Sequence, residues 1–298
     1  GLHEFTHGHT PLRPAHFHEL GPQALTDAVD EVDRAVAAIS SGFDLVLHVT
    51  PVNTPAAKAE FTAARGQRPP EFLYRARTLD PDLVKRKLFN VPIERIEDPA
   101  MAHLFYEKRE ELDRKLTLVA DRNTSRFLLG SRAIYGDPDD ELLATATRIV
   151  ERIEPRPSAE ALPVAQVVAA AEVELARYRA LDPTLGATVE LRKDLPGVMV
   201  SSGNLLIGAS ATVSEQRMEP LFAHEIGTHV LTHHNGCHQP FRELHVGTAG
   251  YEALLEGLAV VWEFLVGGLD AGRLRLLAGR VLAAHVACWG ADFVETHR

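Results

Sequence analysis

The sequence predicts an α+β fold that is mostly helical, with a small antiparallel sheet directly before a helix that carries two histidines. Apolar residues recur at helical spacing over most of the chain, and three short β-prone runs separated by turn residues lie between residues 188 and 207. The chain has 298 residues, of which 45% are hydrophobic, so it can bury an ample core in one large domain or two closely packed ones.

In the first half of the chain, apolar spacing predicts helices at residues 25–39, 81–89, 100–120 and 137–153. Residues 43–49 are predicted to form a buried strand and residues 72–75 a short one, while Pro51 and Pro55 predict a turn into another helix.

Pro155 and Pro157 form the clearest linker of the chain. We therefore expect a flexible, histidine-rich arm over residues 1–20, a mixed helical region over residues 21–156 and a C-terminal region over residues 157–298, packed together as one compact unit.

After the linker, helices are predicted at residues 164–181 and 273–288, and strands at residues 188–191, 198–200 and 205–207. We expect the strands to form an antiparallel sheet with residues 205–209 at its edge, where an extended peptide could pair with the main chain. Pro220 either begins the next helix or kinks a longer one that starts near Ser214.

The chemistry of the chain is concentrated in residues 221–260, which have the sequence LFAHEIGTHVLTHHNGCHQPFRELHVGTAGYEALLEGLAV. His224, His229 and Glu256 offer two imidazoles and a carboxylate, the ligands of a catalytic zinc that keeps one coordination position open. Glu225, beside the first histidine, occupies the place of the general base in zinc hydrolases. The stretch therefore predicts a zinc peptidase site on a zincin-like fold.

The spacing of the two histidines is unusual. His224 and His229 are five residues apart, which places their side chains roughly 140° apart on a regular helix. They can share a metal only if the helix widens locally, as in a one-turn π-helix, and Gly227 between them allows that distortion. We predict a widened turn there.

Other ligand sets are open. His229 with His233, and His234 with His238, have the regular spacing of four residues, although neither pair has a carboxylate directly after its first histidine. Glu256 lies in an apolar run, where a buried carboxylate is costly unless it is paired or bound to a metal. Glu252, one turn earlier, is the alternative ligand.

The segments HEIGTHVLTHHNG and GYEALLEGLAV resemble the microtubule-associated tyrosine carboxypeptidases. They are more similar still to the bacterial relatives described as flavohaemoglobin expression-modulating proteins with a QEGLA motif, although Leu255 stands where those relatives carry Gln. The resemblance implies a zinc ion held by His224, His229 and Glu256, with Glu225 as the catalytic base. It extends upstream through residues 49–55, 70–75 and 127–136, and it leads us to expect that such proteins continue beyond residue 298.

The function that we predict is a zinc carboxypeptidase that hydrolyses C-terminal residues of peptides or protein tails. Glu225 would take a proton from a zinc-activated water and pass it to the leaving amine. Tyr251 and His245 are candidates for stabilising the oxyanion. The terminal carboxylate calls for a cationic side chain, and the candidates are Arg192 first, then Lys193, Arg217 and Arg242.

Composition narrows the partners and the compartment. The net charge of −10 argues against nucleic acid and anionic membranes, and no uninterrupted apolar run is long enough for a membrane span. The only two cysteines, Cys237 and Cys288, are typical of a reducing cytosol, so we expect a cytoplasmic protein.

Two other functions are open. The chain is either a regulatory protein that binds zinc with little or no turnover, or an interaction protein with a closed site in which His245 or Cys237 is a fourth ligand. Glu225 argues against the first of these, because a structural site needs no general base.

Overall fold

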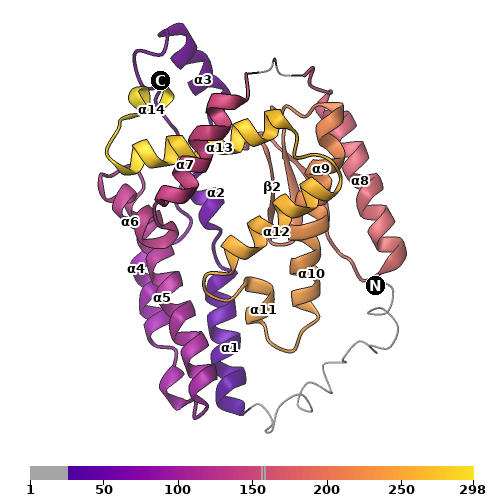
Figure 1. Cartoon of the computed structure of the whole chain (residues 1–298). Coiled ribbons are helices and arrows are strands. Elements are labelled where there is room, and N and C mark those ends of the chain that lie inside the picture. Colours follow the sequence, from indigo (N-terminus) through magenta and orange to yellow (C-terminus); the bar gives the residue numbers. More distant parts are fainter. Residues whose placement is uncertain (1–25, 156, 158) are drawn as a thin grey trace.

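The computed structural model describes residues 26–155, 157 and 159–298, so the predicted arm over residues 1–20 lies outside it. The fold is mostly helical with one small sheet, as predicted (Figure 1). Helices α1 (Asp27–Ser40), α4 (Pro81–Phe89) and α5 (Pro99–Asp121) pack together around buried apolar side chains such as Phe105 and Leu116. The helices predicted in this half are confirmed.

The two strands predicted in this half are wrong. Residues 45–49 form a short helix, α2 (Leu45–Val49), because the carboxylate of Asp44 accepts the backbone N–H of Leu47 at 2.9 Å and caps it. Residues 72–75 form no strand. The backbone N–H of Leu73 instead donates a hydrogen bond to Oδ1 of Asn53 at 2.8 Å. Helix α3 (Thr54–Ala63) follows, with Pro55 in its first turn.

Two of the remaining helices, α7 and α13, join the two halves of the chain. Helix α13 packs against α7, so that the last long helix of the chain lies on the N-terminal half (Figure 1). The bounds of these elements are η2 (Ile93–Arg95), α6 (Arg126–Tyr135), α7 (Asp140–Arg152), α8 (Val164–Leu181), α13 (Ala271–Cys288) and α14 (Phe293–His297).

The sheet differs from the prediction. Strands β2 (Val198–Ser201) and β3 (Asn204–Gly208) form the expected antiparallel hairpin, but β1 (Val189–Arg192) pairs parallel to β3, so the sheet is mixed. The prediction that residues 205–209 lie at the edge is wrong, because β3 is the central strand. Its Leu205, Leu206 and Ile207 are almost fully buried, which the centre of a sheet provides and an edge does not.

The sheet supports a long, interrupted helix. Its three segments are α9 (Glu215–His224), the π-helix η3 (Glu225–Val230) and α10 (Leu231–Cys237), and Pro220 lies inside the first. Buried side chains of α8, β3 and η3, including Leu175, Ile207 and Ile226, form one core around this helix. Helix α12 (Tyr251–Leu265) crosses α9, and α11 (Glu243–Val246) leads into it.

One stretch of the described chain, Asp27–Ala63, contains an 18-residue window with a mean hydropathy of 1.5, which is apolar enough to cross a membrane by length and composition alone. The structure divides it into α1, α2 and α3. Helix α1 is joined to the C-terminal half through Asp30, which pairs with Arg242 at 2.9 Å.

The start of α11 holds a buried carboxyl group, that of Glu243, close to a second one, Asp33 of α1. The carboxylate of Asp33 accepts hydrogen bonds from the backbone N–H groups of Arg242 and Glu243 at 2.8 and 2.9 Å. The side chain of Glu243 is buried, and among the described residues its Oε1 has no hydrogen-bond partner. Burial raises the pKa of Glu243 to about 7 in spite of the nearby Lys108 ammonium. The fold therefore favours the protonated acid.

This arrangement predicts a pH-dependent stability. Because the pKa of Glu243 is higher in the folded than in the unfolded chain, its contribution is most favourable below about pH 4.5 and is lost as the pH rises towards 7. Glu243→Gln should therefore raise the free energy of unfolding by about 2 kcal/mol at pH 8 and by much less at pH 5. Urea unfolding at the two pH values measures this. The exposed Glu94→Gln is the control, and an equal effect of Glu243→Gln at both pH values would contradict the prediction.

Candidate metal centre

The helix that carries the two histidines widens into a π-helix between them. His224 is the last residue of α9 and His229 lies in the following π-helix, so the predicted widened turn is confirmed. The hydroxyl of Thr228 donates to the carbonyl of Ala223, five residues earlier, at 3.2 Å. Gly227 lies in this π-helix, and a Cβ atom added there would lie 3.4 Å from the hydroxyl of Tyr178, an ordinary contact. The two imidazole rings consequently lie with their centroids 5.1 Å apart.

Glu256 of α12 completes a candidate metal site of three side chains. Its carboxylate oxygens lie 3.7 Å from Nε2 of His224 and 3.4 Å from Nε2 of His229. One ligand atom from each of the three residues lies within 4.8 Å of the others, and within the described ranges no other group of this kind is found. Two imidazole nitrogens and a carboxylate oxygen at these separations fit a zinc ion with one open position.

The expectation that Glu256 is buried is wrong, although the residue lies beside the two histidines as expected. Its side chain is 63% exposed rather than buried. Helix α12 covers α9 with one narrow face, on which Ala259 and Glu263 are buried, while apolar residues such as Leu254 and Phe264 face outward. The carboxylate is therefore open to the cleft and accessible to an ion.

The other histidines lie elsewhere. His233 packs against the β2–β3 turn, where a Cβ on Gly203 would lie 2.3 Å from its Nδ1 atom, and its Nδ1 lies 3.7 Å from Sγ of Cys237. His245 contacts the ring of His233 edge-on. His234 is paired with Asp182 at 2.8 Å. None of these residues belongs to the group around Glu256.

A residue that the sequence analysis did not identify orients His224. Glu263 is 1% exposed, and its Oε1 accepts from Nδ1 of His224 at 2.9 Å, which directs Nε2 towards Glu256. Arg273 donates to both oxygens of Glu263 at 2.7 and 2.9 Å, and Arg217 donates at 2.9 Å. Although burial opposes ionisation, these hydrogen bonds hold the pKa of Glu263 well below its ordinary value. Its spacing of seven residues from Glu256, two turns on the same face of a helix, is the signal that could have identified it.

Glu225 is buried and lies at the wall of the cleft, next to His224. Burial raises its pKa to about 7, although the His224 imidazole opposes this shift. A carboxylate with a pKa close to neutrality is suited to accept and return a proton.

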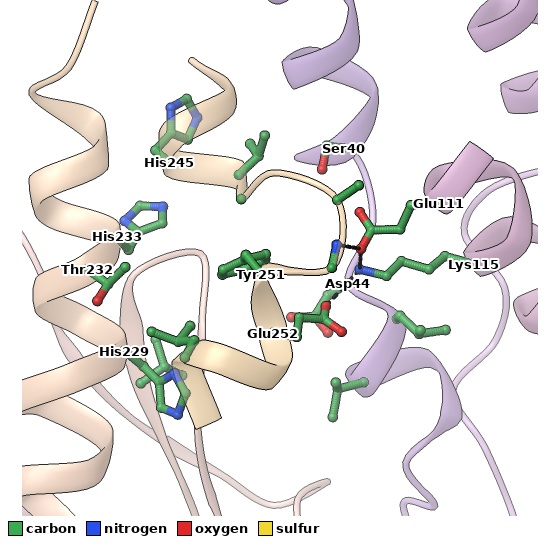
Figure 2. A pocket seen from close by; sticks show the side chains of 18 of the residues that line it. Ser40, Asp44, Glu111, Lys115, His229, Thr232, His233, His245, Tyr251 and Glu252 are labelled. Carbon is green, nitrogen blue, oxygen red and sulfur yellow. Dashed lines mark hydrogen bonds and ion pairs between the residues drawn. The ribbon is translucent and has the colours of Figure 1, made fainter. Parts of the chain in front are cut away.

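The group of three borders a cleft of about 1230 Å³. One wall comes from α5 and the chain between α1 and α2, and the other from β2, the π-helix and α12 (Figure 2). Tyr251 lies in this cleft between the two walls. Its ring packs on Gly247, where a Cβ would lie 2.0 Å from the ring, so only glycine fits there. His245 also lines the cleft.

The cations predicted to bind a terminal carboxylate do not line the cleft. Arg192 is held by Asp194 through two hydrogen bonds of 2.9 Å, and Lys193 is exposed outside the cleft. Arg217 binds Glu263, and Arg242 binds Asp30. The cations that do line the cleft come from α5, and they are Lys108, Arg114 and Lys115.

Glu252, the alternative ligand, also lies away from the group of three. Its Oε1 accepts from Nζ of Lys115 at 2.7 Å.

Comparison with known proteins identifies one family. Residues 59–298 match the family model described as MATCAP: Microtubule-associated tyrosine carboxypeptidase, and this range includes all three residues of the candidate metal site. No curated protein and no solved structure matches the chain.

The position of Glu263 predicts how zinc affinity depends on it. Glu263→Gln keeps the volume but weakens the acceptor that orients His224, so zinc should bind about 10- to 100-fold more weakly. Competition with a chromogenic chelator measures the dissociation constant. Glu252→Gln is the control on the same helix and should leave zinc affinity unchanged. Equal zinc affinity of Glu263→Gln and wild type would show that Glu263 does not support the site.

Proposed function

Because the chain belongs to the microtubule-associated tyrosine carboxypeptidase family, we propose that it is a zinc carboxypeptidase that removes C-terminal residues from peptides or protein tails. The family implies a metallo-carboxypeptidase. The observation that carries the proposal is the convergence of His224, His229 and Glu256 on one point of a large cleft, with Glu225 at its wall.

In this proposal the residues have separate roles. His224, His229 and Glu256 hold the zinc ion, which supplies Lewis-acid chemistry for the scissile carbonyl. Glu225 takes a proton from the attacking water and then delivers it to the leaving amine, a role supported by its pKa of about 7. The Tyr251 hydroxyl, in the same cleft, donates a hydrogen bond to the oxyanion.

The residues EGLA at positions 256–259, shared with the QEGLA motif, support a place in the bacterial branch of the family, although Leu255 departs from its Gln. Cys237 and Cys288 are both free thiols, which supports a cytoplasmic location. The partner is then the C-terminal tail of a peptide or protein.

Two substitutions separate metal binding from catalysis. Elemental analysis should find about one zinc ion per wild-type chain and a loss of zinc in Glu256→Ala, because a ligand is removed. Glu225→Gln should keep zinc and lose about 10²- to 10⁴-fold in kcat, because the proton acceptor is gone. Mass spectrometry of a peptide library measures the shortening of C-termini.

The outcomes are distinct. Zinc without cleavage of any peptide would favour the regulatory alternative. Zinc retained at the wild-type level in Glu256→Ala would refute the ligand assignment.

A further inference from the structure

The α5 wall of the cleft holds three cations that differ in their access to a ligand. Lys108 is 1% exposed, and its Nζ atom lies 2.7 Å from Glu111, so it holds that carboxylate in place and is itself not accessible to a ligand. Arg114 is half-exposed and pairs with Glu110 at 3.2 Å. Lys115 has a side chain only 9% exposed that extends from α5 across the cleft towards α12 (Figure 2). It is therefore the cation that combines burial with a position inside the cleft.

The ammonium of Lys115 contacts two carboxylates. Its Nζ atom lies 2.7 Å from Oε1 of Glu252 and 3.3 Å from Oε1 of Glu111. Because an ammonium group has three donors, one remains for a further acceptor. Burial would lower the pKa of Lys115, but Glu111 and Glu252 outweigh that effect and raise it, so the side chain stays charged.

The two carboxylates are held differently. Glu111 is largely buried, and it is bound by Lys108 and by the backbone N–H of Gly250 at 3.3 Å. Glu252 is 39% exposed, and among the described residues Lys115 is its ion-pair partner. An incoming carboxylate can therefore take the place of Glu252 at the ammonium of Lys115, whereas Glu111 stays in place.

The Lys115–Glu252 pair lies one turn of α12 before Glu256, a separation along the helix comparable to the length of one amino-acid residue. Glu252 precedes Glu256 by one helical turn, about 6 Å along the axis. One extended residue spans about 3.5 Å, and the hydrogen bond to the ammonium adds about 3 Å. A peptide whose scissile carbonyl lies beside Glu256 would thus place the carboxylate of its last residue close to Lys115.

We propose that Lys115 binds the C-terminal carboxylate of the substrate, and that Glu252 occupies this position until the substrate displaces it. The inference rests on the proposed carboxypeptidase function and specifies its ligand: a peptide with a free terminal carboxylate, cut one residue from its end. An amidated peptide lacks the charge that exchanges with Glu252.

The test compares two peptides of the same sequence, one with a free terminal carboxylate and one with a terminal amide. Wild type should prefer the free acid by at least about 30-fold in kcat/KM, because a desolvated charge pair is made with that peptide alone. Lys115→Met should lose this preference through a higher KM for the acid, with the amide unchanged. Glu252→Gln should lower the KM for the acid several-fold, because it removes the competing carboxylate.

Controls separate binding from folding. Arg114→Met changes the adjacent cation of α5 and should keep the wild-type preference, and zinc content with circular dichroism verifies that each variant is folded and loaded. Binding of both fluorescently tagged peptides, measured by anisotropy, gives a readout that needs no turnover.

The outcomes distinguish this inference from the proposed function. If wild type cuts peptides but Lys115→Met keeps the preference for the free acid, Lys115 is not the carboxylate site, and the carboxypeptidase function stands. If wild type cuts neither peptide, the proposed function fails. Equal affinity of wild type for the acid and the amide would then overturn the inference as well.

Discussion

One buried carboxylate joins the parts of the structure on which the site depends. Glu263 of α12 accepts hydrogen bonds from His224 of α9, from Arg217 of the same helix and from Arg273 of α13. A charge at 1% exposure is tolerable only because these donors satisfy it, so the three helices must lie where they do. The same constraint sets the register of α12 against α9, and with it the distance from Glu256 to the histidines.

The π-helix supplies the second constraint. A regular helix would separate His224 and His229 around its axis, whereas the widened turn brings both rings to one side, facing Glu256. The turn is held between α12 and the sheet, and its Ile226 and Val230 are fully buried in the core. The packing of those side chains stabilises a backbone geometry that helix propensity alone would not favour.

The cleft divides its chemistry between the two halves of the chain. The candidate metal site comes from residues 224–256, and the lysine and arginine side chains that line the same cleft come from α5, more than a hundred residues earlier. Helix α5 can present Lys115 there because α1 and α4 hold it in a separate apolar core. Pairing of Lys115 with Glu252 of α12 then joins the two walls. Specificity for a chain terminus would thus be a property of the assembled fold.

The sequence by itself predicted most of the long helices, the candidate ligands His224, His229 and Glu256, and the widened turn, because helical periodicity, the spacing of His224 and His229, and the position of Gly227 are local properties. It did not determine that β3 is central, that residues 45–49 are helical, or that Arg217 is bound to Glu263. Nor did it identify Lys115, because α5 carries many charged residues and nothing in its sequence distinguishes Lys115 from a solvent-exposed lysine. Only the tertiary structure decided these points, because strand order, burial of a charge and the partner of a cation depend on which distant segments meet.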